Sequence, residues 1–177
     1  MYTPGLISRL QSSSNSLVSR LLGKVDGMRH AELADVPCSI SRSLSVLGDR
    51  WTLVILKWSF AGVRRFNHFQ SAMGISRSRL QDRLDRLVEH DILAKVQTDS
   101  TYAEYRLTRK GHDIYPILMA FKDWGDAYMA PDGVPVHYTH RDCGGNAHVR
   151  LECDSCGDEI TARQVLPAPA AGNPLVP

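Results

Sequence analysis

The chain has 177 residues, 43% of them hydrophobic, which suffices for one globular domain with an appendage. Its longest uncharged apolar run, Trp51–Leu56, is far shorter than the roughly 20 residues of a membrane span, and Met1–Arg20 lacks a signal-peptide pattern. From these two features we expect a cytoplasmic protein rather than an integral membrane or secreted one. The formal net charge of +2 is modest for the chain as a whole.

The N-terminal half predicts an extension followed by two helices. Residues 1–37 are rich in serine with only a short apolar pattern, so we expect a helix that is either loose or dependent on a partner. From Cys38 to Gly48, apolar residues recur at helical spacing, at Ile40, Leu44 and Leu47. The strongly apolar segment from Trp51 to Trp58 predicts a second helix at the centre of the core.

Two further helices and a hairpin are predicted next. Asn67 is the expected cap of a helix through about Met73, and Gly74 gives a tight turn. Another helix is expected from about Ser76. Beyond it, alternating patterns at 93–97 and 102–107, separated by a polar run, predict a β-hairpin.

Thr108 is the expected cap of one long final helix that reaches Tyr128. Pro116, inside that helix, is predicted to kink it. The helix carries a continuous apolar stripe of Ile114, Ile117, Leu118, Phe121, Trp124 and Tyr128. We expect Ile114 and Leu118 to lie in the core.

The helix from Ser76 has its charges sorted by face. Its apolar face holds Leu80, Leu84, Leu87 and Val88; Asp82, Asp85 and Glu89 share a second face, and Arg79, Arg83, Arg86 and His90 a third. A helix selected only for stability would interleave opposite charges, so an anion is expected against the arginines. Residues 38–125 also hold 14 Lys and Arg against 9 Asp and Glu, whereas residues 126–177 hold 3 against 7. A solvated charged face is the alternative.

Helix, turn, arginine-bearing helix and hairpin is the order of a winged helix-turn-helix, whose second helix enters the major groove. Arginine suits both guanine edges and phosphates, and the first turn of a helix also favours phosphate. The candidate DNA-binding residues are Arg64, Arg65, Ser76, Arg77, Ser78, Arg79, Gln81, Arg83, Arg86, Lys95 and Tyr102.

Several short pieces then resemble one family, the HxlR-type bacterial winged-helix transcriptional regulators. In order they are Cys38, Gly48-Asp49-Arg50-Trp51-Thr52, Arg65-Phe66-Asn67-His68-Phe69, Gly74-Ile75-Ser76, Tyr105-Arg106-Leu107-Thr108 with Gly111, and Trp124-Gly125. The resemblance implies a homodimer that binds double-stranded operator DNA of pseudo-palindromic sequence. It favours a dimer interface at the aromatic end of the last helix: Phe121, Trp124 and Tyr128.

The chain departs from the family pattern at two places. Asp91 follows the arginine-bearing helix where the family commonly has glycine, and it is expected to take the left-handed conformation at some cost. The hairpin carries Tyr102 and Ala103 where a basic residue is common, with only Lys95 and Arg106 nearby. Insertion of a wing arginine into the minor groove is therefore in question.

A Cys/His cluster near the C-terminus has zinc-ribbon spacing. His140-x-x-Cys143 is followed after nine residues by Cys153-x-x-Cys156-Gly157, two short ligand pairs joined by a possible hairpin. Three thiolates and one imidazole complete a tetrahedral, structural zinc site, with His137 or His148 as substitutes for His140. A metal-free hairpin that retains its cysteines is the alternative. No internal repeat is evident.

Cys38 lies at a predicted helix N-terminus, where the dipole can lower a thiol pKa, so it is a candidate oxidant sensor; a small buried residue is the simpler interpretation. A small molecule is the other candidate effector of the protein, besides an oxidant. The chain has no nucleophile motif, phosphate loop or paired carboxylates, so we expect no enzyme and no membrane partner. The alternative to a DNA-binding regulator is a zinc-containing protein-interaction adaptor without direct DNA readout.

The predicted fold is mainly α with a small β-hairpin (α+β): a winged helix-turn-helix with a C-terminal zinc-ribbon-like hairpin. Its predicted segments are an N-terminal extension at 1–37 that can form a dimerisation helix, a winged-helix DNA-binding and dimerisation domain at 38–130, a small Cys/His unit at 131–166, and a disordered tail at 167–177.

Overall fold

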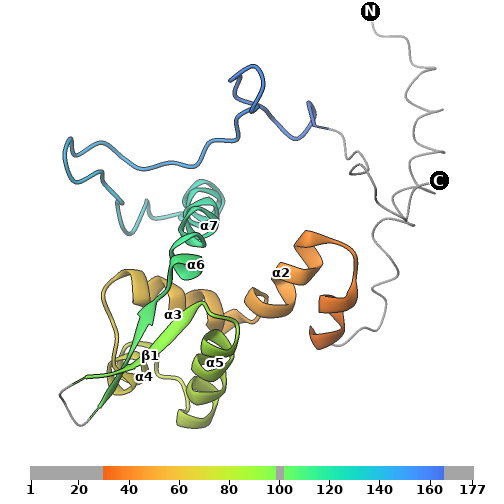
Figure 1. The fold of residues 1–177 in the computed structure, drawn as a ribbon. Helices are drawn as coiled ribbons and strands as arrows, with labels where there is room; N and C mark the ends of the chain where they lie inside the picture. Colours follow the sequence, from red (N-terminus) through yellow and green to blue (C-terminus); the bar gives the residue numbers. More distant parts are fainter. Residues whose placement is uncertain (1–29, 99–101, 166–177) are drawn as a thin grey trace, which may run out of the picture. The chain divides into compact units, whose positions relative to one another are not determined.

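The computed structural model describes residues 30–98 and 102–165 (Figure 1). The predictions for the rest of the N-terminal extension, for the tip of the hairpin and for the end of the tail lie outside the described residues. The described chain forms two compact units that divide between Leu53 and Val54, and each is considered by itself.

The first unit contains the 3-10 helix η1 (His30–Asp35), helix α2 (Ser39–Leu47) and the start of helix α3 (Arg50–Phe60). The carbonyl of Val36 joins η1 to α2, because it accepts from the backbone N–H of Cys38 at 2.7 Å and from Nε of Arg42 at 3.1 Å. Asp49 opens α3 by accepting the N–H of Trp51 at 2.9 Å. The predicted helix break at Gly48 is confirmed.

The second unit holds the core and the helix-turn-helix. Helix α4 (Phe66–Met73) ends at Gly74, whose φ of 61° makes the tight turn that was predicted. Arg65, rather than Asn67, is the N-cap of α4, without a side-chain bond, because the helix begins two residues earlier than the cap pattern suggested. Helix α5 (Arg77–Glu89) begins within one residue of the predicted start near Ser76, and Ser76 is its N-cap.

The hairpin consists of strands β1 (Leu93–Gln97) and β2 (Ala103–Leu107), antiparallel with Leu93 opposite Leu107. The Arg64-Arg65 segment pairs with β2 through an isolated β-bridge: the N–H of Tyr105 donates to the carbonyl of Arg64 at 2.8 Å, and Arg65 bridges to Glu104. This pairing fixes the start of α4 beside the β1-β2 hairpin, which is the wing of the fold.

The junction between α5 and the hairpin is tightly bonded. Asp91 has φ 56°, the left-handed conformation expected at this C-cap. The Thr108 hydroxyl donates to the carbonyl of Asp91 at 2.5 Å and accepts the N–H of Gly111 at 3.0 Å. One side chain therefore ties the end of α5 to the element after the wing.

The predicted single long helix from 108 to 128 is wrong. Thr108 caps the short helix α6 (Arg109–His112), and a separate helix α7 (Tyr115–Tyr128) follows. Pro116 lies in the first turn of α7 and does not kink it, since a proline in that turn needs no backbone N–H and its fixed φ suits a helix start. The Tyr115 ring packs on Phe60 of α3 at 4.8 Å.

The core of the second unit draws on α3, α4, α5, α7 and both strands. Ile114 is buried as predicted, whereas Leu118 is half-buried and Met119 takes its place in the core. The buried apolar residues of this unit are Ile55, Leu56, Phe69, Ile75, Leu80, Leu84, Leu87, Ile92, Leu93, Tyr105, Ile114 and Met119.

After α7 the chain has turns and two isolated β-bridges but no helix or strand as far as residue 165. The hairpin expected to join the two Cys/His pairs is not formed there; each pair closes a small turn of its own. Within residues 30–98 and 102–165, no helix combines the length and apolar character that a membrane crossing requires.

Gly111→Ala should destabilise the fold. A Cβ at this buried position would lie inside van der Waals contact of the Ile92 carbonyl oxygen and 3.0 Å from the Leu107 side chain. Because the oxygen belongs to the backbone, we expect the free energy of unfolding to fall by about 1–3 kcal/mol. Urea denaturation followed by circular dichroism measures it. Gly125→Ala, with nothing within 4 Å, is the control and should gain about 0.5–1 kcal/mol; equal effects would contradict the packing.

Candidate nucleic-acid interface

A groove of about 410 Å³ lies between the start of α4, the first turns of α5 and the wing. Five of the predicted DNA-binding residues meet there although they come from three separate segments. They are Arg65, Arg77, Gln81, Lys95 and Tyr102. The structure thus places cations from the segment before α4, from α5 and from the hairpin on one surface.

Aromatic rings support two of these cations. The Arg77 guanidinium carbon lies 5.0 Å from the centre of the Phe66 ring, and Lys95 Nζ lies 5.8 Å from that of Tyr105. Such contacts orient a cation without neutralising it. Tyr105 is buried, so the Lys95 side chain rests on a rigid part of the sheet.

Glu104 lies between two groove residues in the sequence, Ala103 and Tyr105, and its carboxylate is already bonded. Its carboxylate accepts from Nε and Nη2 of Arg106 at 3.1 and 2.9 Å and lies 3.9 Å from Nε of Arg65. The side chain of Glu104 is only 15% exposed. The groove therefore presents net positive charge to an approaching ligand.

The exposed face of α5 changes sign along the helix. Gln81 Nε2 donates to Oδ1 of Asp85 at 2.7 Å, and Asp82, Asp85 and Glu89 are all exposed. The first turn instead exposes Arg77, and the backbone N–H groups of a first helical turn attract anions. An anion is thus favoured at the start of α5 and opposed along its C-terminal half.

The remaining predicted residues do not line this groove. Arg64, Ser76, Ser78 and Arg79 are exposed, whereas Arg83 and Arg86 are half-buried on the flank of α5 that Arg79 shares. Sequence periodicity grouped these arginines correctly on one face but could not show which side the wing covers. Lining residues outside the predicted DNA-binding set are Phe66, Asn67, Ala103 and Tyr105. All of these except Ala103 belong to motifs that carry the family resemblance, which was the available signal.

An apolar stripe on α7 is open to solvent in the single chain. Phe121 and Trp124 are each 58% exposed, and Tyr128 is 74% exposed. The Trp124 and Tyr128 rings lie 5.6 Å apart, and a shallow apolar hollow is lined by Ile117, Ala120, Phe121 and Trp124. So large a cluster of exposed aromatic side chains is typical of an interaction surface.

Cys38 is the N-cap of α2 and is half-buried, in the first unit of the chain. The Ser41 backbone N–H, followed by the Ser41 hydroxyl, bonds to the sulfur and lowers the pKa of the Cys38 thiol. The direction agrees with a thiol at a helix start. Its use as an oxidant sensor stays a prediction.

The Cys/His residues of the segment that follows α7 form two separate pairs. His140 Nδ1 lies 3.3 Å from the Cys143 sulfur. Backbone N–H groups, of Cys156 first and then of Ser155, bond to the Cys153 sulfur and lower the pKa of that thiol. In the described ranges, no group of three or more His, Cys, Asp or Glu side chains is placed to hold a metal ion.

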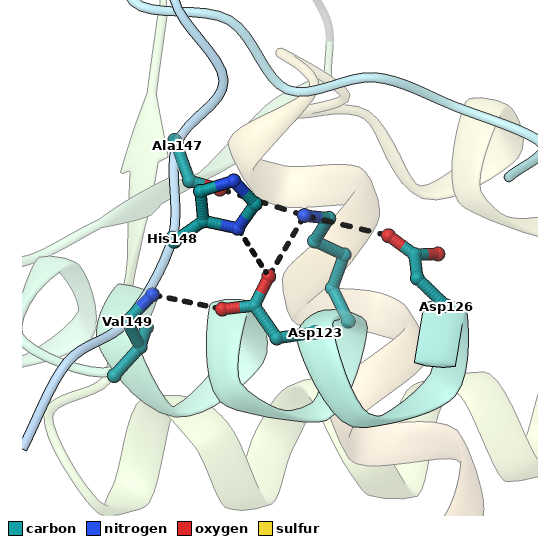
Figure 2. A network of polar contacts seen from close by, with 6 residues as sticks. Asp123, Asp126, Ala147, His148 and Val149 are labelled. Atoms are coloured by element: carbon teal, nitrogen blue, oxygen red, sulfur yellow. Dashed lines mark hydrogen bonds and ion pairs between the residues drawn. The ribbon is translucent and has the colours of Figure 1, made fainter. Parts of the chain in front are cut away.

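Asp123 of α7 anchors the segment between these pairs (Figure 2). Its carboxylate accepts the backbone N–H of Val149 at 2.8 Å and lies 3.3 Å from His148 Nδ1, while Lys122 Nζ bonds to it at 2.8 Å. Lys122, and next the Val149 N–H, lower the pKa of Asp123 to about 2. The anchor is therefore ionised at neutral pH.

Comparison with known proteins adds a family to this geometry. The family model described as "HxlR-like helix-turn-helix" matches residues 46–133. An HTH-type transcriptional regulator of Mycobacterium tuberculosis, Rv3095, is 43% identical over 137 residues, which cover 76% of this chain and 87% of the relative. The chain belongs to the HxlR-like helix-turn-helix family.

Two solved structures agree with this membership. PA1607, described as a candidate transcription factor, superimposes with a TM-score of 0.72 at 33% identity, covering 76% of this chain and 96% of its own. PA1374 from Pseudomonas aeruginosa, described likewise, has a TM-score of 0.56 at 28% identity and covers 77% of this chain and 94% of its own. The likeness to PA1607 and Rv3095 extends beyond residues 46–133, and the predicted winged helix-turn-helix fold is confirmed.

Proposed function

We propose that this HxlR-like protein is a homodimeric transcriptional regulator that binds a pseudo-palindromic DNA operator and performs no chemistry on it. The groove carries the proposal, since it brings Arg65, Arg77 and Lys95 together beside the first turn of a recognition helix. A surface that places three cations next to a helix of the kind that enters the major groove suits duplex DNA.

Within this proposal the two ends of α5 have different roles. Arg77 and Gln81 lie where the helix start meets the major groove and are the proposed base-reading side chains. Lys95 and Arg65 are proposed to bind the phosphates that flank the groove. The acidic C-terminal half of α5 stays out of the DNA, so the helix enters by its N-terminal end.

The α7 stripe is the proposed dimer interface. Phe121, Trp124 and Tyr128 follow at helical spacing with Ile117, so one face of α7 can pack against the same face of a second copy. A two-fold dimer would present two recognition helices to two half-sites.

Removal of the groove cations should weaken DNA binding in two distinguishable ways. Arg77→Ala should cost about 1–3 kcal/mol of binding free energy and relax the base preference. Lys95→Ala should instead weaken binding to all duplex sequences alike, and it should reduce the slope of the logarithm of the binding constant against the logarithm of salt concentration by about one. Fluorescence anisotropy with random and with selected duplexes, across salt concentrations, measures both. Arg109→Ala removes an exposed cation outside the groove and should change neither.

If binding is insensitive to salt, or if Arg77→Ala and Lys95→Ala behave like Arg109→Ala, the DNA proposal is wrong. A protein-interaction adaptor would give that result, because its contacts release few counterions.

Trp124→Asp should convert the dimer to a monomer, since it places a charge at the centre of the apolar stripe. Light scattering after size-exclusion chromatography gives the mass. Val136→Asp, at an exposed apolar residue outside the stripe, should leave the mass unchanged. A dimer that survives the Trp124 change would place the interface elsewhere.

A further inference from the structure

The segment that follows α7 contains an internal repeat that the sequence alone did not reveal. Residues 138–147 and 151–160 form the same turn, 13 positions apart. Three backbone N–H to carbonyl hydrogen bonds occur in both copies at equivalent positions. In the first copy they run from Ala147 to Tyr138 at 2.8 Å, from His140 to Gly145 at 2.7 Å and from Gly144 to His140 at 2.8 Å. In the second copy they run from Ile160 to Leu151 at 2.9 Å, from Cys153 to Asp158 at 3.0 Å and from Gly157 to Cys153 at 2.9 Å.

The repeat also matches the metal-ligand residues in register. His140 corresponds to Cys153, and Cys143 corresponds to Cys156. The glycine after each second cysteine has positive φ, 72° at Gly144 and 74° at Gly157, a conformation that favours glycine. Each turn also closes with an isolated bridge, Thr139 to Asn146 in one and Glu152 to Glu159 in the other. Two short hairpin turns that each carry a ligand pair are the halves of a zinc-ribbon site.

The first turn has ligand-like geometry. Zinc bonds of roughly 2.0 Å to nitrogen and 2.3 Å to sulfur at a tetrahedral angle put the two ligand atoms about 3.5 Å apart. The distance from His140 Nδ1 to the Cys143 sulfur is 3.3 Å. The other ring nitrogen, Nε2, faces Oδ2 of Asp142 at 3.7 Å, and a carboxylate beside the second nitrogen is the usual outer partner of a zinc-bound histidine.

The second turn repeats the backbone geometry of the first around its own pair of cysteines. The N–H of Cys153 donates to the carbonyl of Asp158 at 3.0 Å, and the N–H of Gly157 donates to the carbonyl of Cys153 at 2.9 Å. Cys153 and Cys156 therefore lie at the two ends of one closed turn, as a C-x-x-C ligand pair does. Residues 131–165 are almost entirely exposed, so within this described segment no apolar core explains why two such turns are repeated.

We propose that the two turns together bind one zinc ion per chain, through His140, Cys143, Cys153 and Cys156. Four protein ligands leave no coordination position open, so the ion is structural. The proposal stands independently of the DNA-binding function.

Zinc binding requires the two turns to come together, because the structure keeps the two pairs apart. Nine residues separate Cys143 from Cys153. Closing so short a loop costs little compared with the free energy of binding zinc to thiolates, so the ion would drive the closure. The linker is held to α7 at Val149 by Asp123, so the closed unit would remain attached to the proposed dimer helix.

The repeat also selects the histidine ligand. His137 and His148 were the sequence-based substitutes for His140, but neither occupies the position equivalent to Cys153. His148 faces Asp123 at 3.3 Å and serves the anchor instead. His140 alone among the three has a cysteine sulfur within ligand distance in the structure.

Titration of the reduced, metal-depleted full-length protein with Co²⁺, followed by zinc competition, tests the site. We expect a tetrahedral thiolate spectrum that saturates at one equivalent per chain. Cys153→Ser and His140→Ala should weaken zinc binding by more than the roughly 10- to 100-fold loss typical of an outer partner. Zinc should also protect the segment that follows α7 from proteolysis, in the wild type only. This readout does not depend on DNA binding.

Matched controls separate ligation from other effects. His137→Ala, His148→Ala and Cys38→Ser keep all four ligands and should bind as the wild type does. Asp123→Ala should release the linker from α7 without lowering metal content. Equal binding by Cys153→Ser and the wild type would overturn the proposal, and so would saturation at half an equivalent, which would mean that two chains share the ion. Circular dichroism of the winged helix shows whether each variant is folded.

Discussion

The structure depends on the burial of one face of α5. Leu80, Leu84 and Leu87 are at most 1% exposed, and burial of each contributes about 1.5–3 kcal/mol. Because these leucines lock the rotation of the helix about its axis, they also decide where its charges point. Arg77 and Gln81 are directed to the wing, and Asp82, Asp85 and Glu89 to solvent.

The backbone around α5 turns that orientation into a surface. Thr108 joins the end of α5 to the segment after the wing, and the Arg64 carbonyl joins the sheet to the start of α4. The groove cations are therefore held by three elements that share one hydrogen-bonded frame. A rigid frame lowers the entropy cost of positioning several cations for one ligand, which favours an affinity that arises from arrangement as well as charge.

Much of this fold was predictable because its signals are local. The leucine spacing of α5, the glycine turn at Gly74 and the alternation in the hairpin each determine their own element. Pro116 was misread because periodicity continues across the break between α6 and α7, whereas a proline can open a helix as readily as it can kink one. The composition of the groove was not predictable, since it depends on which flank of α5 the wing covers. The repeat in the segment that follows α7 was hidden because histidine replaces cysteine in its first copy and the shared feature is a hydrogen-bond pattern.

The central claim is that DNA meets the chain at the first turns of α5 and the wing, and not along the whole helix. Photo-cross-linking tests it most directly, with a photoreactive amino acid placed singly at Gln81, Ala103 or Glu89 and a duplex selected by the wild-type protein. The account predicts cross-links from positions 81 and 103 and none from position 89. Equal cross-linking from position 89, or none from the two groove positions, would contradict it.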